Sequence, residues 1–108
     1  MKIKELTDNG FDILALPDPE REIEGVYIGD LLSWVMGRAK ENEAWVTIMS
    51  NLNVIAVASL SDVASVIFAE GVIPDGEIIE VAKEKGVNLL VSPLPSYETA
   101  IKLSELLK

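Results

Sequence analysis

The sequence predicts an α/β fold with a largely parallel sheet and helices on both of its faces. From Asp30 onward, short apolar strands alternate with helical segments, which is the pattern of βαβ units. The strands expected at 44–49, 65–69 and 87–91 are almost wholly apolar, as buried strands are. We therefore expect a three-layer α/β/α sandwich whose mostly parallel sheet has about five strands.

The N-terminal part predicts a short helix and two further strands. The helix would end at Gly10 in the left-handed conformation, and it could be seated by three apolar residues, Ile3, Leu6 and Phe11. Strands follow at 11–16 and 26–28, and the two prolines between them indicate a loop. These strands lie too close in sequence for a helical crossover, so we expect them to pair differently and to give a mixed sheet.

Helix starts and stops follow from short polar residues and glycines. We expect helices at 31–36, 52–60, 76–85 and from 96 to near the C-terminus. Their expected N-caps are Asp30, Asn51 or Asn53, Asp75 and Ser96. Gly37 and Gly86 are in position to end two of the helices, and Ser61-Asp62 could begin another turn.

Length and charge limit the organisation and the partners. The chain has 108 residues, which suits one domain covering residues 1–108. Its net charge of −9 would repel nucleic acid and anionic membranes. No apolar run approaches the roughly 20 residues of a membrane span. Charges interrupt the first ten residues, so we expect no signal peptide and a cytoplasmic protein.

The residue types that are missing limit the chemistry. The chain has neither Cys nor His, which excludes thiol nucleophiles, zinc sites built on those residues and serine–histidine couples. An enzyme would have to use a carboxylate or a lysine with a strongly shifted pKa. We therefore expect no catalytic residues, no metal site and no cofactor.

Two expected helices are apolar in every direction, unlike the one-sided helices of most small domains. The first contains five large apolar residues, Leu31, Leu32, Trp34, Val35 and Met36, and the second is the run 54–58. One explanation is that one of them lies deep between the sheet and a neighbouring helix, or that part of the run is strand. The alternative that we favour is a homodimer in which the first helix forms the interface.

Polar residues follow the expected strands at their carboxyl ends, where ligands bind in open α/β sheets. The set is Asp30, Ser50, Asn51, Asn53, Ser92 and Ser96. With the N-termini of the following helices, these groups could bind a small anionic ligand. Each is also an ordinary N-cap residue, and for any single one capping is the more common role. Arg21 and Arg38 could clamp an anion, although a surface ion pair is commoner.

Four segments resemble the small DRTGG domain family: Tyr27–Ser33, Asn53–Ala58, Pro74-Asp75 and Pro93–Glu98. That domain occurs alone or attached to CBS-pair and phosphotransacetylase-type enzymes. It is similar to the N-terminal domains of HPr kinase/phosphorylase and of Mur ligases, so the resemblance implies an α/β/α fold. The segment that names the family should fall near 20–25, where only Arg21 and Gly25 fit. The kinase's catalytic P-loop lies in another domain, so no kinase activity is implied.

These observations lead to two functional hypotheses. The first is a non-catalytic regulatory module that senses a nucleotide or phosphate, or docks on a partner enzyme or kinase. The second is a protein–protein adaptor or serine phosphoacceptor without a small ligand. In that case a phosphate on Ser50 or Ser96 would lie at a helix start, where the helix dipole stabilises it.

Overall fold

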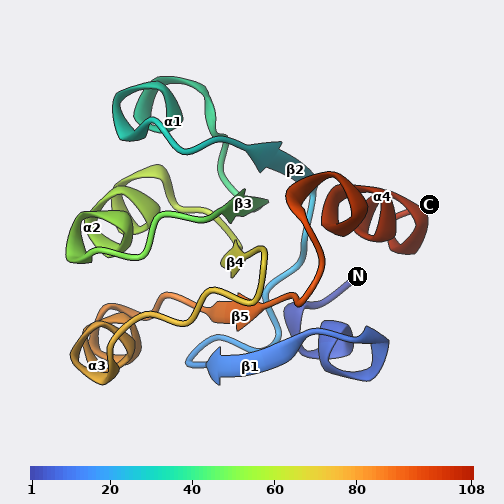
Figure 1. The fold of residues 1–108 in the computed structure, drawn as a ribbon, viewed down its shortest axis with the longest axis horizontal. Helices are drawn as coiled ribbons and strands as arrows, with labels where there is room; N and C mark the ends of the chain where they lie inside the picture. Colours follow the sequence, from blue (N-terminus) through green and yellow to red (C-terminus); the bar gives the residue numbers. More distant parts are fainter.

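The computed structural model describes residues 1–108 and holds one five-stranded sheet between two helical layers (Figure 1). The strands are β1 (Asp12–Ala15), β2 (Gly25–Ile28), β3 (Glu43–Thr47), β4 (Ser65–Phe68) and β5 (Leu89–Val91). The helices are the 3-10 helix η1 (Ile3–Asn9), α1 (Leu32–Arg38), α2 (Leu52–Ser61), α3 (Gly76–Lys85) and α4 (Ser96–Leu106). None of the helices has the length and apolar character needed to cross a bilayer.

The sheet has the order β1-β5-β4-β3-β2. Strands β2 to β5 are parallel, whereas β1 pairs antiparallel with β5. The predicted fold class and the mixed sheet are therefore confirmed. The central strand β4 is buried along its whole length, which explains its uninterrupted apolar character.

The helices divide unequally between the two faces of the sheet. Figure 1 shows α1, α2 and α3 side by side on one face, with α4 and η1 on the other. The cause lies in the strand order, because β2, β3, β4 and β5 are neighbours in chain order. Crossovers of one hand that progress in one direction place all their helices on the same face. After β5 the chain passes to the opposite face, where η1 already lies.

A separate apolar core fills each interface between sheet and helices. Fourteen buried residues, among them Trp45, Val54 and Phe68, pack between the sheet and α1–α3. Eleven others, among them Phe11, Ile67 and Leu103, pack between the sheet and the layer of η1 and α4. The Trp45 indole NH donates to the Gly29 carbonyl over 2.9 Å, so the largest core side chain also fixes the end of β2.

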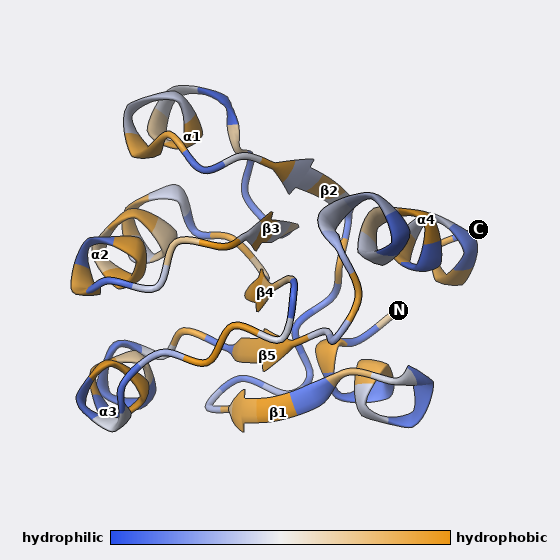
Figure 2. Cartoon of the chain, in the orientation of Figure 1, coloured by the Kyte–Doolittle hydropathy of each residue, from blue (hydrophilic) through white to orange (hydrophobic).

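The position of α2 explains its unusual composition. It is the middle helix of its layer, packed between α1 and α3, and it buries Val54, Ile55, Val57 and Ala58. Figure 2 shows α2 as apolar over most of its length, whereas α3 carries hydrophilic stretches. Leu52 and Leu60 nevertheless remain 50% and 74% exposed. Deep placement therefore accounts for the inner side of α2 and leaves its outer side unexplained.

Some predicted helix ends are confirmed, and others are wrong. Gly10 and Gly86 end η1 and α3 with φ of +89° and +73°. Asp75 occupies the N-cap position of α3, although its side chain makes no capping hydrogen bond. In contrast, α1 continues past Gly37 to Arg38. Asp62 begins no further turn but ends α2 in the left-handed region, with φ of +54°.

Arg21 joins the loops at the amino ends of the strands. Its Nε donates to Asn42 Oδ1 over 2.8 Å, and its Nη2 donates to the Asp62 carbonyl over 2.6 Å and pairs with Asp62 Oδ1 at 2.8 Å. Asn42 and Asp62 both have positive φ, +66° and +54°. Arg21 therefore holds two residues in a conformation that non-glycine residues seldom adopt. The predicted ion pair of Arg21 is confirmed.

Glu20 forms a second cluster beside the N-terminus. Its carboxylate accepts hydrogen bonds from Lys2 at 2.8 Å and from Lys4 at 2.7 Å. These bonds lower the pKa of Glu20 from 4.5 to about 2, and the Glu20 carboxylate in turn raises the pKa of Lys2. The Glu20 side chain is exposed, so this cluster orients the first residues and adds little to stability.

Replacing Arg21 should destabilise the fold by more than the loss of an exposed ion pair. We expect Arg21→Met to lower the free energy of unfolding by about 1–3 kcal/mol, because the Asn42 side-chain oxygen and the Asp62 carbonyl lose their donor. Urea denaturation followed by circular dichroism measures the change. The matched control is Lys83→Met, which breaks an exposed pair with Glu80 and should cost less than about 0.5 kcal/mol. Equal effects of both substitutions would contradict the structural role of Arg21.

Candidate functional site

The predicted ligand-site residues all follow the carboxyl ends of the parallel strands. These ends lie along one edge of the sheet, where the chain passes through residues 29–31, 48–51, 69–75 and 92–95. We call this the carboxyl edge. Asp30, Ser50, Asn51, Asn53, Ser92 and Ser96 all lie in these loops or in the first turn of the next helix. Three of these side chains, those of Asp30, Asn51 and Ser92, make hydrogen bonds within the local structure.

Asp30 does not cap α1, contrary to the prediction. The N-cap position belongs to Leu31, and no side chain caps this helix. Asp30 Oδ1 instead accepts hydrogen bonds from Thr47 Oγ1 over 2.8 Å and from the Ile48 NH over 3.0 Å. The carboxylate thus ties the loop after β2 to the end of β3. One side-chain oxygen is used in this way, and Asp30 is otherwise exposed.

Asn51, rather than Asn53, caps α2. Asn51 Oδ1 accepts a hydrogen bond from the Asn53 NH over 2.9 Å, which satisfies one of the free amides of the first turn. The Asn53 side chain lies exposed in that turn, and the Ser50 side chain is half-buried before it. Ser50 and Asn53 therefore belong to the predicted set without a side-chain role in building the loop.

Ser92 belongs to the interior, and Ser96 is not the cap of α4. The N-cap position of α4 is Pro95, so Ser96 is the first helical residue and the prediction is wrong. Ser92 is 1% exposed; its Oγ lies 2.8 Å from Thr99 Oγ1 and accepts from the Leu94 NH over 3.2 Å. These bonds hold the proline-rich loop against the start of α4.

The strand order also locates the position where a ligand crevice is expected. The chain leaves β4 toward α3 and leaves the neighbouring β5 toward α4, on opposite faces of the sheet (Figure 1). Such a divergence opens the crevice of many α/β domains. Here the two loops are bonded together, because Glu70 NH donates to the Leu94 carbonyl over 2.9 Å and Gly71 NH to the Ser92 carbonyl over 2.8 Å. Sequence reasoning missed this closure, and only Gly71 indicated an unusual turn there.

The charges of the carboxyl edge are unfavourable for a free anion. None of the nine basic residues lies in its four loops, whereas Asp30, Glu70 and Asp75 do. Backbone amides at the starts of α2, α3 and α4, with small polar side chains, are the donors that these loops offer. No group of three or more acidic side chains is close enough to hold a metal ion.

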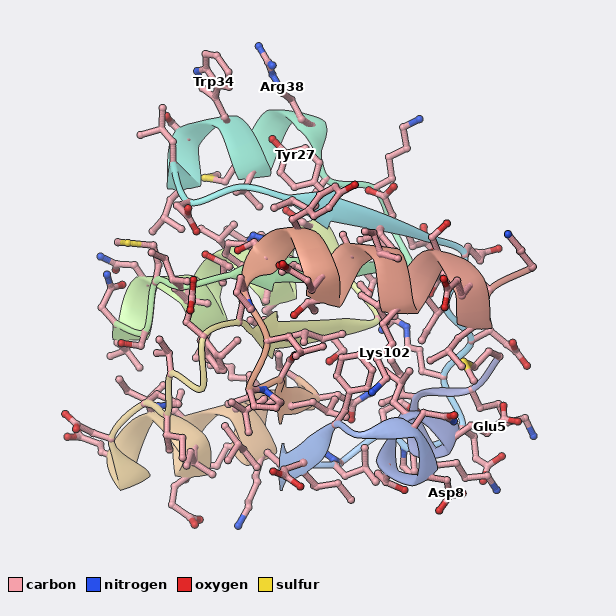
Figure 3. The ribbon with its side chains drawn as sticks, turned by 45° about the vertical axis from the view of Figure 1, so that its right-hand side comes forward. Glu5, Asp8, Tyr27, Trp34, Arg38 and Lys102 are labelled. Carbon is pink, nitrogen blue, oxygen red and sulfur yellow. The ribbon has the colours of Figure 1, made fainter.

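The predicted interface helix α1 has one buried and several exposed members. Val35 is fully buried and Leu32 packs against the core, so these two serve the monomer. Leu31, Trp34 and Met36 are 59%, 54% and 54% exposed. The Arg38 guanidinium lies 3.8 Å from the centre of the Trp34 ring, and Figure 3 shows both side chains pointing outward, with Tyr27 below them.

A solved structure resembles this fold closely. It is the crystal structure of the CBS and DRTGG domains of the regulatory region of Clostridium perfringens pyrophosphatase, complexed with the activator diadenosine tetraphosphate. The match has a TM-score of 0.69 at 19% sequence identity and covers 93% of this chain and 44% of that one. This chain therefore spans less than half the length of its structural neighbour. No family model and no curated protein matches the sequence.

The cap of α2 can be tested with two adjacent asparagines. Asn51→Ala should lower the free energy of unfolding by about 1 kcal/mol, because the backbone NH of Asn53 loses its acceptor. Asn53→Ala is the control and should change stability by no more than about 0.5 kcal/mol, as surface substitutions do. Urea denaturation measures both values. A larger loss for Asn53→Ala than for Asn51→Ala would contradict the assignment.

Proposed function

We propose that the chain is a non-catalytic regulatory domain that acts as a homodimer. It would either sense a small anionic ligand at the carboxyl edge or dock on a partner enzyme. The observation that carries this proposal is the likeness in fold to a pyrophosphatase regulatory region over 93% of the chain. The four sequence segments that resemble the DRTGG family support it and make the DRTGG domain of that crystal the expected counterpart.

The geometry favours contact with protein over sensing of a free anion. The crevice expected between β4 and β5 is bonded shut, and its surroundings carry carboxylates without a basic residue. An exposed apolar and aromatic surface lies elsewhere, on α1 and β2. Apolar and aromatic surface of this kind is where proteins meet.

The edge strand β2 supports a symmetric dimer. It pairs only with β3, and its residues Gly25–Ile28 include no charge, no proline and no bulge. The opposite edge strand, β1, begins with Asp12 and has an irregular register between Ile13 and Ala15. Charges and bulges are the devices that protect edge strands from pairing with another chain. β2 lacks them, so we propose that a second copy covers this edge.

The exposed side of α1 extends the same surface. Trp34 and Arg38 point outward from α1, and Figure 3 shows Tyr27 of β2 beneath them in that view. Leu31, directly before α1, is 59% exposed. Trp, Tyr and Arg are the residue types that contribute most at protein interfaces. Antiparallel pairing of β2 across a twofold axis normal to the sheet would bring two α1 helices together on one face, with the Trp34 rings between them.

Truncation of Trp34 tests the dimer. We expect wild-type protein to have the mass of a dimer by light scattering and Trp34→Ala to shift it to monomer, because the central aromatic contact is lost. Tyr97→Ala is the matched control, since Tyr97 is a 73% exposed aromatic residue on α4, and this variant should remain dimeric. A monomeric wild-type protein at high micromolar concentration would overturn the dimer.

Removal of one charge at the carboxyl edge tests ligand sensing. The protein is screened by thermal shift against adenine and uridine nucleotides, sugar phosphates and inorganic phosphate, since a ligand of the native state raises Tm. For a compound that binds there, Asp30→Asn should tighten binding by roughly twofold to fivefold, because the amide oxygen keeps the bonds to Thr47 and Ile48 while the repulsive charge is lost.

The control for this test is Glu105→Gln, which removes one charge near the end of α4 and should leave the affinity unchanged. If no compound raises Tm, the sensing role fails and the docking role remains. The partner is then sought by co-purification from the host, and the mass of the purified chain shows whether a serine carries phosphate.

A further inference from the structure

The surface has a hollow in its helical layer, away from the bonded β4 and β5 loops. It lies between α2 and α3, has a volume of about 350 Å³, and is lined by Leu52, Ile55, Ala56, Ser59, Leu60, Val81 and Lys85. This volume falls near the lower end of the roughly 300–1,000 Å³ of small-molecule sites. We call it the α2–α3 groove.

The groove gives a reason for the uncharged, apolar composition of the outer side of α2. That helix contains no charged residue from Leu52 to Ser61, and Leu52, Ala56, Ser59 and Leu60 remain exposed although its inner side is fully packed. An uncharged outer side of this length is unusual for a helix in contact with water. A ligand in the groove would cover these residues and remove their apolar surface from solvent.

One end of the groove carries a cation that has no partner. Lys85 is the single charged side chain of the lining, and it takes part in none of the ion pairs of the structure. The chain has 18 acidic and 9 basic residues, and the neighbouring Lys83 pairs with Glu80. Lys85 is therefore free to meet a negative charge from outside. Ser59, in the last turns of α2, adds a hydroxyl donor to the lining.

We infer that the α2–α3 groove binds a small amphipathic anion, with an alkyl chain along Leu52, Ile55 and Val81 and a carboxylate at Lys85. A purely apolar molecule would leave Lys85 unused, and a purely polar anion would leave the apolar walls wet. The combination of five apolar residues, one hydroxyl and one free ammonium selects a ligand that carries both parts. This site is separate from the carboxyl edge and does not depend on the role proposed for that edge.

Decanoate, below its micelle concentration, is the probe. We expect it to bind wild-type protein by isothermal titration and to shift the amide NMR signals of α2 and of the last turns of α3. Lys85→Gln should weaken binding by roughly twofold to fivefold, the effect of one exposed ion pair. Decanol should bind wild-type protein more weakly than decanoate by a similar factor. Ala56→Trp should abolish binding, because the exposed Ala56 lines the groove and the indole would fill it.

Lys83→Gln is the matched control, because it removes the same charge two residues away on the same helix, outside the groove, and should bind decanoate as wild type does. The inference is overturned if decanoate does not bind, if Lys85→Gln or Ala56→Trp binds it as tightly as wild type, or if Lys83→Gln is weakened as much as Lys85→Gln. The inference is also overturned if a second copy of the chain covers the groove in solution. That result would be seen as a dimer that Leu60→Glu dissociates. If no nucleotide binds at the carboxyl edge, the inference about the α2–α3 groove still stands.

Discussion

The winding of β2 to β5 in one direction is the constraint from which the rest of the structure follows. Because these strands are neighbours in chain order, their crossovers of one hand place α1, α2 and α3 on one face. That layer makes α2 a central helix, buried on its inner side and touched by a helix on each flank. The opposite face is left to η1 and α4, and the divergence of the chain between β4 and β5 becomes the one place where an α/β crevice could open.

At that divergence, the hydrogen bonds that satisfy buried polar groups hold the two loops together, and no crevice opens. Ser92 and Thr99 are each about 1% exposed or less, so their hydroxyls must find partners inside the protein. They bond to each other and to the backbone of Leu94, and the backbone NH groups of Glu70 and Gly71 complete the closure. The polar residues at the carboxyl edge are therefore used mainly to shape its loops. This argues for a rigid domain whose contacts lie on its outer helices and on the free strand β2.

The sequence predicted the elements and their order because these depend on periodicity and on glycine. The strands, the helices and the ends at Gly10 and Gly86 follow from patterns within about ten residues. The role predicted for Asp30 was wrong because a cap and a tertiary acceptor use the same side chain, and only folding brings Thr47 to Asp30. The role predicted for Ser96 was wrong because α4 begins one residue earlier than expected, with Pro95 at the N-cap position. Arg21 shows the same limit, since its two partners lie 21 and 41 residues away. The lack of basic residues at the carboxyl edge, in contrast, could be read from the sequence once the strands were assigned.

The location of the cations has a physical cause that bears on function. Helices that follow parallel strands end at the amino edge of the sheet, and the negative end of each helix dipole favours a basic residue there. Arg38 in the last turn of α1, and Lys83 and Lys85 in the last turn of α3, fit this rule. The same rule keeps basic residues away from the starts of the helices, which form the carboxyl edge. Of these helix-end cations, Lys83 pairs with Glu80, Arg38 is stacked on Trp34, and Lys85 takes part in no ion pair, which leaves it able to meet an external anion.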